Sequence, residues 1–350
     1  MSLLPYLHRV TSREDLEPED ARAAMEAILD GHATTGQIAG FLVALKMKGE
    51  TSDELVGFAQ AMRDHVDRVD CGALGEPLID TCGTGGAPVL TFNISTVAAF
   101  VIAGAGVRVA KHGNRSLNSI CGSADVLEAL GVRIQMSASR MAEAIRVTGI
   151  GFLFAPGLHP AMKHAQPARL ELKMRTVFNL LGPLTNPAGA ASQLIGAPSE
   201  HSADLMAHAL AKLGTDHSFV VHGLDGLDEV STTGPTLVYE VKGGGVRKHL
   251  WTPGDFGVKR ASLSDLAGGD ALTNASIARS VLEGEVGAQR DIVLVNASAA
   301  LVAAGRATDL RSGVRTAADS IDSGAAADRL ARLIRFSAEE SLHAGTKAAS

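Results

Sequence analysis

The first seventy residues carry apolar side chains at the spacing of amphipathic helices. One such stripe, at positions i, i+3, i+4 and i+7, consists of Ile38, Phe41, Leu42 and Leu45. Capping-box spacing, Thr34 with Gln37 and Thr51 with Glu54, marks the starts of two helices. We therefore expect a small helical bundle, whose apolar stripe packs either within the chain or against a second copy of it.

Beyond residue 73, short apolar runs alternate with helical segments, which predicts a mostly parallel sheet covered by helices on both faces. Strands are expected at residues 77–82, 107–110, 151–155, 193–197 and 218–222. Helices are expected to start near 93 and near 122, and to cover 159–172 and 199–213. Residues 236–241 and 246–251 should pair antiparallel through a glycine turn at 243–245, and the last hundred residues should be mainly helical.

Two strand-to-helix turns carry the candidate chemistry. The first is Gly83–Gly86, and the helix after it starts near Asn93 among the hydroxyl groups of Thr91, Ser95 and Thr96. The second, Lys111–Arg115, places two cations, an imidazole and an amide around a glycine. Free backbone N–H groups and the helix dipole favour anions at such positions, so the pair predicts a ligand with more than one phosphate. The alternatives are a plain glycine turn and a solvated basic turn.

Charged side chains elsewhere extend this hypothesis. Asp228 and Glu229 follow the strand at 218–222, at the sheet edge where ligands usually bind. Adjacent carboxylates repel unless a cation is near them, and ligands that are all oxygen indicate Mg²⁺. One arginine, Arg169 or Arg175, has the forked geometry that binds a carboxylate substrate. The alternatives are an acidic surface loop and a structural ion pair.

Composition narrows the class of protein. The 350 residues carry a formal net charge of −6, 4% aromatic residues and no long basic run, which argues against nucleic-acid binding. The cysteines, Cys71, Cys82 and Cys121, form neither a disulfide framework nor a metal motif. With no signal peptide and no apolar segment long enough to span a bilayer, the chain is expected to be a cytoplasmic protein without membrane contact.

These motifs, in this order, resemble the anthranilate phosphoribosyltransferase family over nearly the whole chain. The resemblance rests on residues 80–86 with 91–96, 111–115 with 122–131, 159–163, 175–187 and 225–231. It implies an α/β fold with a smaller helical domain and the active site in the hinge cleft. The helical domain would be residues 1–72 with a contribution from 165–190, and the α/β domain residues 73–164 and 191–350.

The resemblance also implies a reaction. The 5-phosphoribosyl group of phosphoribosyl pyrophosphate (PRPP) would pass to the amine of anthranilate, giving N-(5-phosphoribosyl)anthranilate and pyrophosphate, a step of tryptophan biosynthesis. A homodimer would form through the helical domains. No proton-transfer residue is assigned, because an aromatic amine is already a neutral nucleophile at pH 7.

The family's site residues transfer onto matching positions. PRPP would be held by Gly83, Gly86, Ala87, Thr91, Asn93, Ile94, Ser95, Thr96, Lys111, His112, Gly113, Asn114, Arg115, Ser116, Leu117, Asn118, Ser119 and Ser123. Anthranilate would contact Gly83, His112, Asn114, His159 and Arg169, with Arg169 on its carboxylate. Mg²⁺ would be bound by Ser95, Asp228 and Glu229.

The chain departs from the family in two places. Ala87-Pro88 replaces the usual Asp-Gly after the glycine turn, which removes a carboxylate and stiffens the loop. Asn118 stands where a serine is common. The competing hypotheses are a pyrimidine nucleoside phosphorylase and a non-catalytic, nucleic-acid-binding relative of the same fold.

Overall fold

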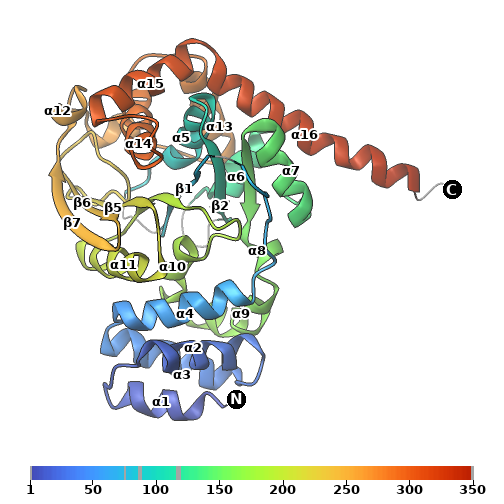
Figure 1. Cartoon of the computed structure of the whole chain (residues 1–350), viewed down its shortest axis with the longest axis vertical. Helices are drawn as coiled ribbons and strands as arrows, with labels where there is room; N and C mark the ends of the chain where they lie inside the picture. The colour runs from blue at the N-terminus through green and yellow to red at the C-terminus, as the bar shows by residue number, and fades with distance from the viewer. Residues whose placement is uncertain (1, 75, 86–88, 116–119, 348–350) are drawn as a thin grey trace.

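A computed structural model describes residues 2–74, 76–85, 89–115 and 120–347, with 340–347 described by backbone alone. A helical bundle that holds the N-terminus lies at one end of the long axis, and a larger α/β body lies at the other (Figure 1). In the described part of the chain, no helix is long and apolar enough to cross a membrane.

The bundle contains the helices α1 (Leu4–Thr11), α2 (Pro18–Leu29), α3 (Thr35–Lys48) and α4 (Ser52–Asp64). Both predicted capping boxes are present, Thr34 with Gln37 and Thr51 with Glu54. A later segment of the chain packs against the bundle. It consists of η1 (Pro160–His164), α9 (Gln166–Leu172), α10 (Phe178–Leu181) and η2 (Gly182–Thr185). The predicted stripe at 38–45 is buried in this combined core, so the within-chain packing accounts for it.

The described residues of the α/β body form a seven-stranded sheet in the order β3-β2-β1-β4-β5-β6-β7. The strands are β1 (Leu78–Gly83), β2 (Arg108–Gly113), β3 (Ile150–Phe154), β4 (Ser192–Gly196), β5 (His217–Gly223), β6 (Thr236–Lys242) and β7 (Gly245–Trp251). β1 to β5 run parallel to one another, whereas β6 pairs antiparallel with β5, and β7 pairs antiparallel with β6. Gly243 and Gly244 both adopt positive φ in the β6–β7 turn, which agrees with the glycine turn expected there from the sequence.

Helices cover both faces of this sheet. The helical elements of the α/β body are α5 (Ile94–Gly104), α6 (Ser123–Leu130), α7 (Ala138–Thr148), α8 (Ala155–Leu158), α11 (Glu200–Leu213), α12 (Pro253–Phe256), η3 (Leu263–Leu266), α13 (Ala271–Leu282), α14 (Ala288–Ala303), α15 (Leu310–Asp322) and α16 (Ala325–Lys347). α5 and α14 pack on one face, with α13, α15 and α16 around them. α11 packs on the other face, between the sheet and α4 of the bundle. The mostly parallel sheet with a helical domain is therefore confirmed.

Two predicted elements differ from the structure. β2 continues to Gly113, because residues 111–113 pair with residues 152–154 of β3. The predicted helix at 159–172 is instead the 3-10 turn η1 followed by α9, because a proline at position 167 has no N–H to continue a helical ladder. α9 ends at Leu172, before a left-handed Lys173 (φ 48°), so Arg175 lies beyond the helix.

Candidate active site

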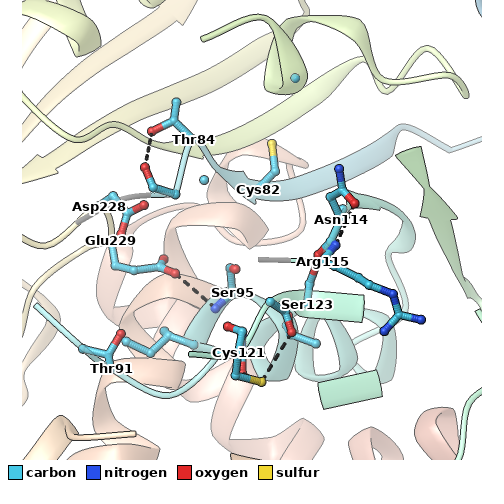
Figure 2. Close-up of a pocket in the computed structure, with 18 of the residues that line it drawn as sticks. Cys82, Thr84, Thr91, Ser95, Asn114, Arg115, Cys121, Ser123, Asp228 and Glu229 are labelled. Carbon is cyan, nitrogen blue, oxygen red and sulfur yellow. Dashed lines mark hydrogen bonds between the residues drawn. The ribbon is translucent and has the colours of Figure 1, made fainter. Parts of the chain in front are cut away.

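A cavity of about 360 Å³ opens at the carboxyl ends of β1 and β2. One wall belongs to the α/β body: the two predicted turns, the start of α5 and the pair Asp228–Glu229 (Figure 2). The rest of the lining includes Arg169, Arg175 and Phe178, from the segment that packs on the bundle. The cavity therefore lies where the two parts of the fold meet.

The start of α5 brings the three predicted metal ligands together. Asn93 occupies the N-cap position but makes no capping hydrogen bond. Instead the backbone N–H of Ser95 donates to Glu229 Oε1 at 3.2 Å, as Figure 2 shows. Thr96 is buried, and its hydroxyl has no hydrogen-bond partner among the described residues. A carboxylate from the β5–β6 loop thus caps the helix end that was predicted to attract an anion.

Two glycines, Gly83 and Gly196, leave the space that the acidic pair Asp228–Glu229 occupies at the site. A Cβ on Gly196 would lie 1.7 Å from the carbonyl oxygen of Asp228, and a Cβ on Gly83 would lie 3.1 Å from Asp228 Oδ2. Burial raises the pKa of Asp228, and burial together with the Asp228 charge raises the pKa of Glu229 to about 8. The charges of Arg175 and Lys111 only partly offset this effect of burial, and a bound cation would favour the charged form of both carboxyl groups further.

The donor set fits Mg²⁺ better than zinc. The described residues contain no cluster of three His, Cys, Asp or Glu side chains able to hold a metal. Two carboxylates and the Ser95 hydroxyl leave several positions of an octahedral ion to water and substrate phosphate, which is the usual arrangement for Mg²⁺.

Lys111 lies at the base of the cavity, in β2. Only 3% of its surface is exposed, and its ammonium group donates to the carbonyl of Thr81 and to Ser95 Oγ at 3.4 Å. Burial lowers the pKa of Lys111, whereas the nearby charge of Asp80 raises it. Lys111 therefore brings positive charge directly beneath Ser95.

Asp80 had no role predicted from the sequence, yet it anchors β2. Its fully buried carboxylate accepts hydrogen bonds from the backbone N–H of His112 (3.1 Å) and from Asn186 Nδ2 (2.8 Å). Asn186 also donates to the carbonyl of Ala110 at 2.9 Å. Together these bonds hold the strand that carries Lys111 and His112.

Arg115 is not a free cation in this structure. Its guanidinium lies 2.9 Å from Asp125 Oδ1 and also pairs with Glu128, both on α6. Nearby, Ser123 Oγ donates to the carbonyl of Asn114 at 3.2 Å, and a Cβ on Gly113 would lie 2.3 Å from that hydroxyl. Arg115 therefore lines the cavity with its guanidinium already paired to two carboxylates.

His112 and His159 form a neutral pair with ring centroids 5.2 Å apart. His112 Nδ1 lies 3.1 Å from the Gly182 carbonyl, so this nitrogen carries the proton. Burial, aided by His159, lowers the pKa of His112 to about 3, and burial lowers the pKa of His159 to about 4. Nε2 of each ring is buried without a partner among the described residues. His112 lines the cavity, whereas His159, which was also predicted to contact anthranilate, is not among the described residues that line it.

Two arginines face the site from the bundle side. The Arg169 guanidinium lies 5.3 Å from the centroid of the Phe178 ring and has no carboxylate partner among the described residues. Burial lowers its pKa accordingly. Arg175 donates to the backbone carbonyls of Thr84 and Gly85, and so ties this wall to the glycine turn. The sequence did not predict this contact, because Arg175 and Gly85 are far apart in the chain.

Some predicted site residues lie outside the described part of the chain. They are Gly86, Ala87, Ser116, Leu117, Asn118 and Ser119, and the departures at Ala87-Pro88 and Asn118 fall there too. The cavity is lined by Gly83, Thr91, Asn93, Ile94, Ser95, Thr96, Lys111, His112, Gly113, Asn114, Arg115, Ser123, Arg169, Asp228 and Glu229. It is also lined by Gly268, Gly269 and Asn274, which no sequence motif had indicated.

Comparisons with known proteins agree with this geometry. Residues 4–66 match the helical bundle domain, and residues 75–327 the a/b domain, of the glycosyl transferase family. The anthranilate phosphoribosyltransferase of Solibacter usitatus is 60% identical over 97% of this chain and 99% of its own length.

Two solved structures extend the likeness to three dimensions. The Thermus thermophilus enzyme of the same name has a TM-score of 0.89 at 43% identity, covering 96% of this chain and 99% of its own. The Saccharomyces cerevisiae enzyme, solved in complex with PRPP and Mg, has a TM-score of 0.87 at 28% identity, covering 96% and 98%. The chain belongs to the anthranilate phosphoribosyltransferase family.

Proposed function

We propose that this chain transfers the 5-phosphoribosyl group from PRPP to the amine of anthranilate and releases pyrophosphate, as a step of tryptophan biosynthesis. One observation carries the proposal. The lining of a single cavity includes both an oxygen donor set for a phosphate-bound cation and an arginine that has no carboxylate partner among the described residues. These are the groups that a pyrophosphate donor and a carboxylate acceptor require.

On the donor side, the residues would act on the leaving pyrophosphate. Ser95, Asp228 and Glu229 would hold Mg²⁺, which when bound neutralises phosphate charge. Lys111, beneath Ser95, adds a fixed positive charge to the same region. Arg175 donates to the carbonyls of the glycine turn and so brings a second cation to this region. Charge that develops on the leaving group would thus meet preorganised positive groups.

On the acceptor side, the residues would orient the amine. Arg169 would bind the anthranilate carboxylate, and Phe178 beneath it supports the guanidinium. The low pKa values of His112 and His159 keep both rings neutral at pH 7, so they place no positive charge where the ribosyl carbon becomes cation-like. Catalysis would then depend on alignment of the two substrates and stabilisation of the pyrophosphate, without a strong general base.

Loss of anthranilate fluorescence with PRPP, measured with and without Mg²⁺, tests this proposal. We expect Mg²⁺-dependent loss with release of one pyrophosphate per anthranilate consumed. Glu229→Gln should abolish most of the activity. Thymidine or uridine with phosphate serves as the control for a nucleoside phosphorylase, a function that none of the comparisons supports. No loss at any Mg²⁺ concentration would contradict the proposal.

We also propose a cytoplasmic homodimer formed through the helical domain, comprising residues 1–72 with 165–190. The support is local. Met47 of α3 and Leu4 of α1 expose 71% and 39% of their surface on the bundle. The cysteines in the described residues are all unpaired, which fits a reducing compartment. Light scattering on the purified chain, with Met47→Glu as the disrupting variant, tests the dimer; a monomeric wild type would contradict it.

A further inference from the structure

Asn274, in α13, is a buried polar side chain at the cavity without a role in the reaction above. Only 2% of its surface is exposed. Its Oδ1 accepts a hydrogen bond from the backbone N–H of Gly269 at 2.7 Å, and its Nδ2 donates to Asn93 Oδ1 at 3.0 Å. It therefore ties a C-terminal helix to the residue that begins α5.

Asn93 is in turn hydrogen-bonded to Cys121, the residue before the N-cap of α6. Its Nδ2 donates to the carbonyl of Cys121 at 3.2 Å, and its Oδ1 also accepts from Cys121 Sγ at 3.4 Å. Cys121 immediately precedes Gly122, the N-cap of α6. The Asn93 amide occupies the N-cap position of α5 but joins the starts of α5 and α6 instead of capping the helix.

Gly268 allows a close contact between the segment before α13 and the segment that leads into α5. A Cβ on Gly268 would lie 2.5 Å from the backbone nitrogen of Phe92, so only glycine allows this approach. Thr91 pairs with Ala267 in an isolated β-bridge. By holding the N–H of Gly269, Asn274 fixes this strip against the segment that leads into α5.

We propose that Asn274 is a positioning residue for PRPP, which sets the spacing between the N-termini of α5 and α6. This inference rests on the proposed function. The two helix starts are the predicted phosphate positions, and one ligand engages both only at a fixed separation. Because Arg169 belongs to α9, which packs on the bundle, and Asn274 to α13 of the α/β body, a change at Asn274 is expected to affect the donor and spare the acceptor.

Two variants test the inference. Asn274→Ala removes both hydrogen bonds, while the isosteric Asn274→Asp keeps the acceptor for Gly269 and places an oxygen against Asn93 Oδ1. A buried hydrogen bond left unmade costs about 1–3 kcal/mol, so the Kd and KM for PRPP should rise about 5- to 150-fold. The KM for anthranilate should change less than about twofold, within the scatter of independent sites. PRPP binding is measured by calorimetry with Mg²⁺, and both KM values by fluorescence.

Controls separate positioning from general stability. Ser320→Ala removes a buried hydrogen bond to the far end of α5, at the carbonyl of Val101, and should leave both KM values unchanged. In an Asn93→Ala background, Asn274→Ala should add little further loss, because the two residues act through each other. Circular dichroism and thermal unfolding establish that each variant is folded.

Each remaining result overturns a stated claim. Suppose that the wild type is active. If the Asn274 variants then bind PRPP normally, or if their KM values for PRPP and anthranilate rise equally, the positioning role alone is overturned. The same PRPP defect in Ser320→Ala overturns it too. A wild-type chain that neither binds PRPP nor consumes anthranilate overturns the proposed function and this inference with it.

Discussion

Arg169→Ala should weaken anthranilate binding while leaving PRPP almost unaffected. The Arg169 guanidinium is partly buried, lies 5.3 Å from the Phe178 ring centroid and meets no carboxylate among the described residues. A substrate carboxylate would satisfy it. Hydrogen bonds to charged groups contribute about 1.5–3 kcal/mol, which corresponds to a rise of about 10- to 150-fold in the KM for anthranilate.

The assay measures both KM values by anthranilate fluorescence and repeats the measurement with anthranilamide, which lacks the negative charge. Wild type should prefer anthranilate, and Arg169→Ala should lose most of that preference. Arg140→Ala is the matched control, because Arg140 also lies over a ring, 3.5 Å from the centroid of Phe336, away from the cavity. An equal rise in both KM values, or an unchanged preference for anthranilate, would refute the carboxylate assignment.

Two further predictions concern the loop that carries Asp228 and Glu229 and the pair of histidines His112 and His159. Gly196→Ala should displace the Asp228–Glu229 loop, because the new Cβ would lie 1.7 Å from the Asp228 carbonyl oxygen; a Mg²⁺ titration should show weaker activation, whereas Gly157→Ala, with open space around it, should match wild type. The folded chain keeps His112 neutral down to about pH 3 and His159 down to about pH 4, whereas the unfolded chain protonates both near pH 6.5. The free energy of unfolding should therefore fall as pH drops below about 6.5, by about 1.4 kcal/mol per pH unit for each histidine. Urea unfolding at several pH values checks this, and an unchanged pH dependence in His112→Gln would contradict it.

Short-range patterns were sufficient for most elements of the fold. The capping boxes at Thr34 and Thr51 and the glycine turn at 243–244 form between residues a few positions apart. The alternation of strand and helix likewise follows from local hydrophobic spacing. The two turns and the acidic pair could be identified because each is a contiguous cluster of chemical groups, and the parallel topology brings all three to one sheet edge.

The sequence by itself thus determined the class of fold and the residue types available for chemistry, whereas the partners of those residues were decided by the tertiary structure. β2 extends through Gly113 because β3 lies beside it. Arg115, a cation in a predicted phosphate turn, is neutralised by Asp125 and Glu128. Asn93 bonds to Asn274 across 181 positions rather than capping its own helix. Hydrogen bonds and desolvation depend on which groups meet in space, and a local pattern carries no information about a partner that distant.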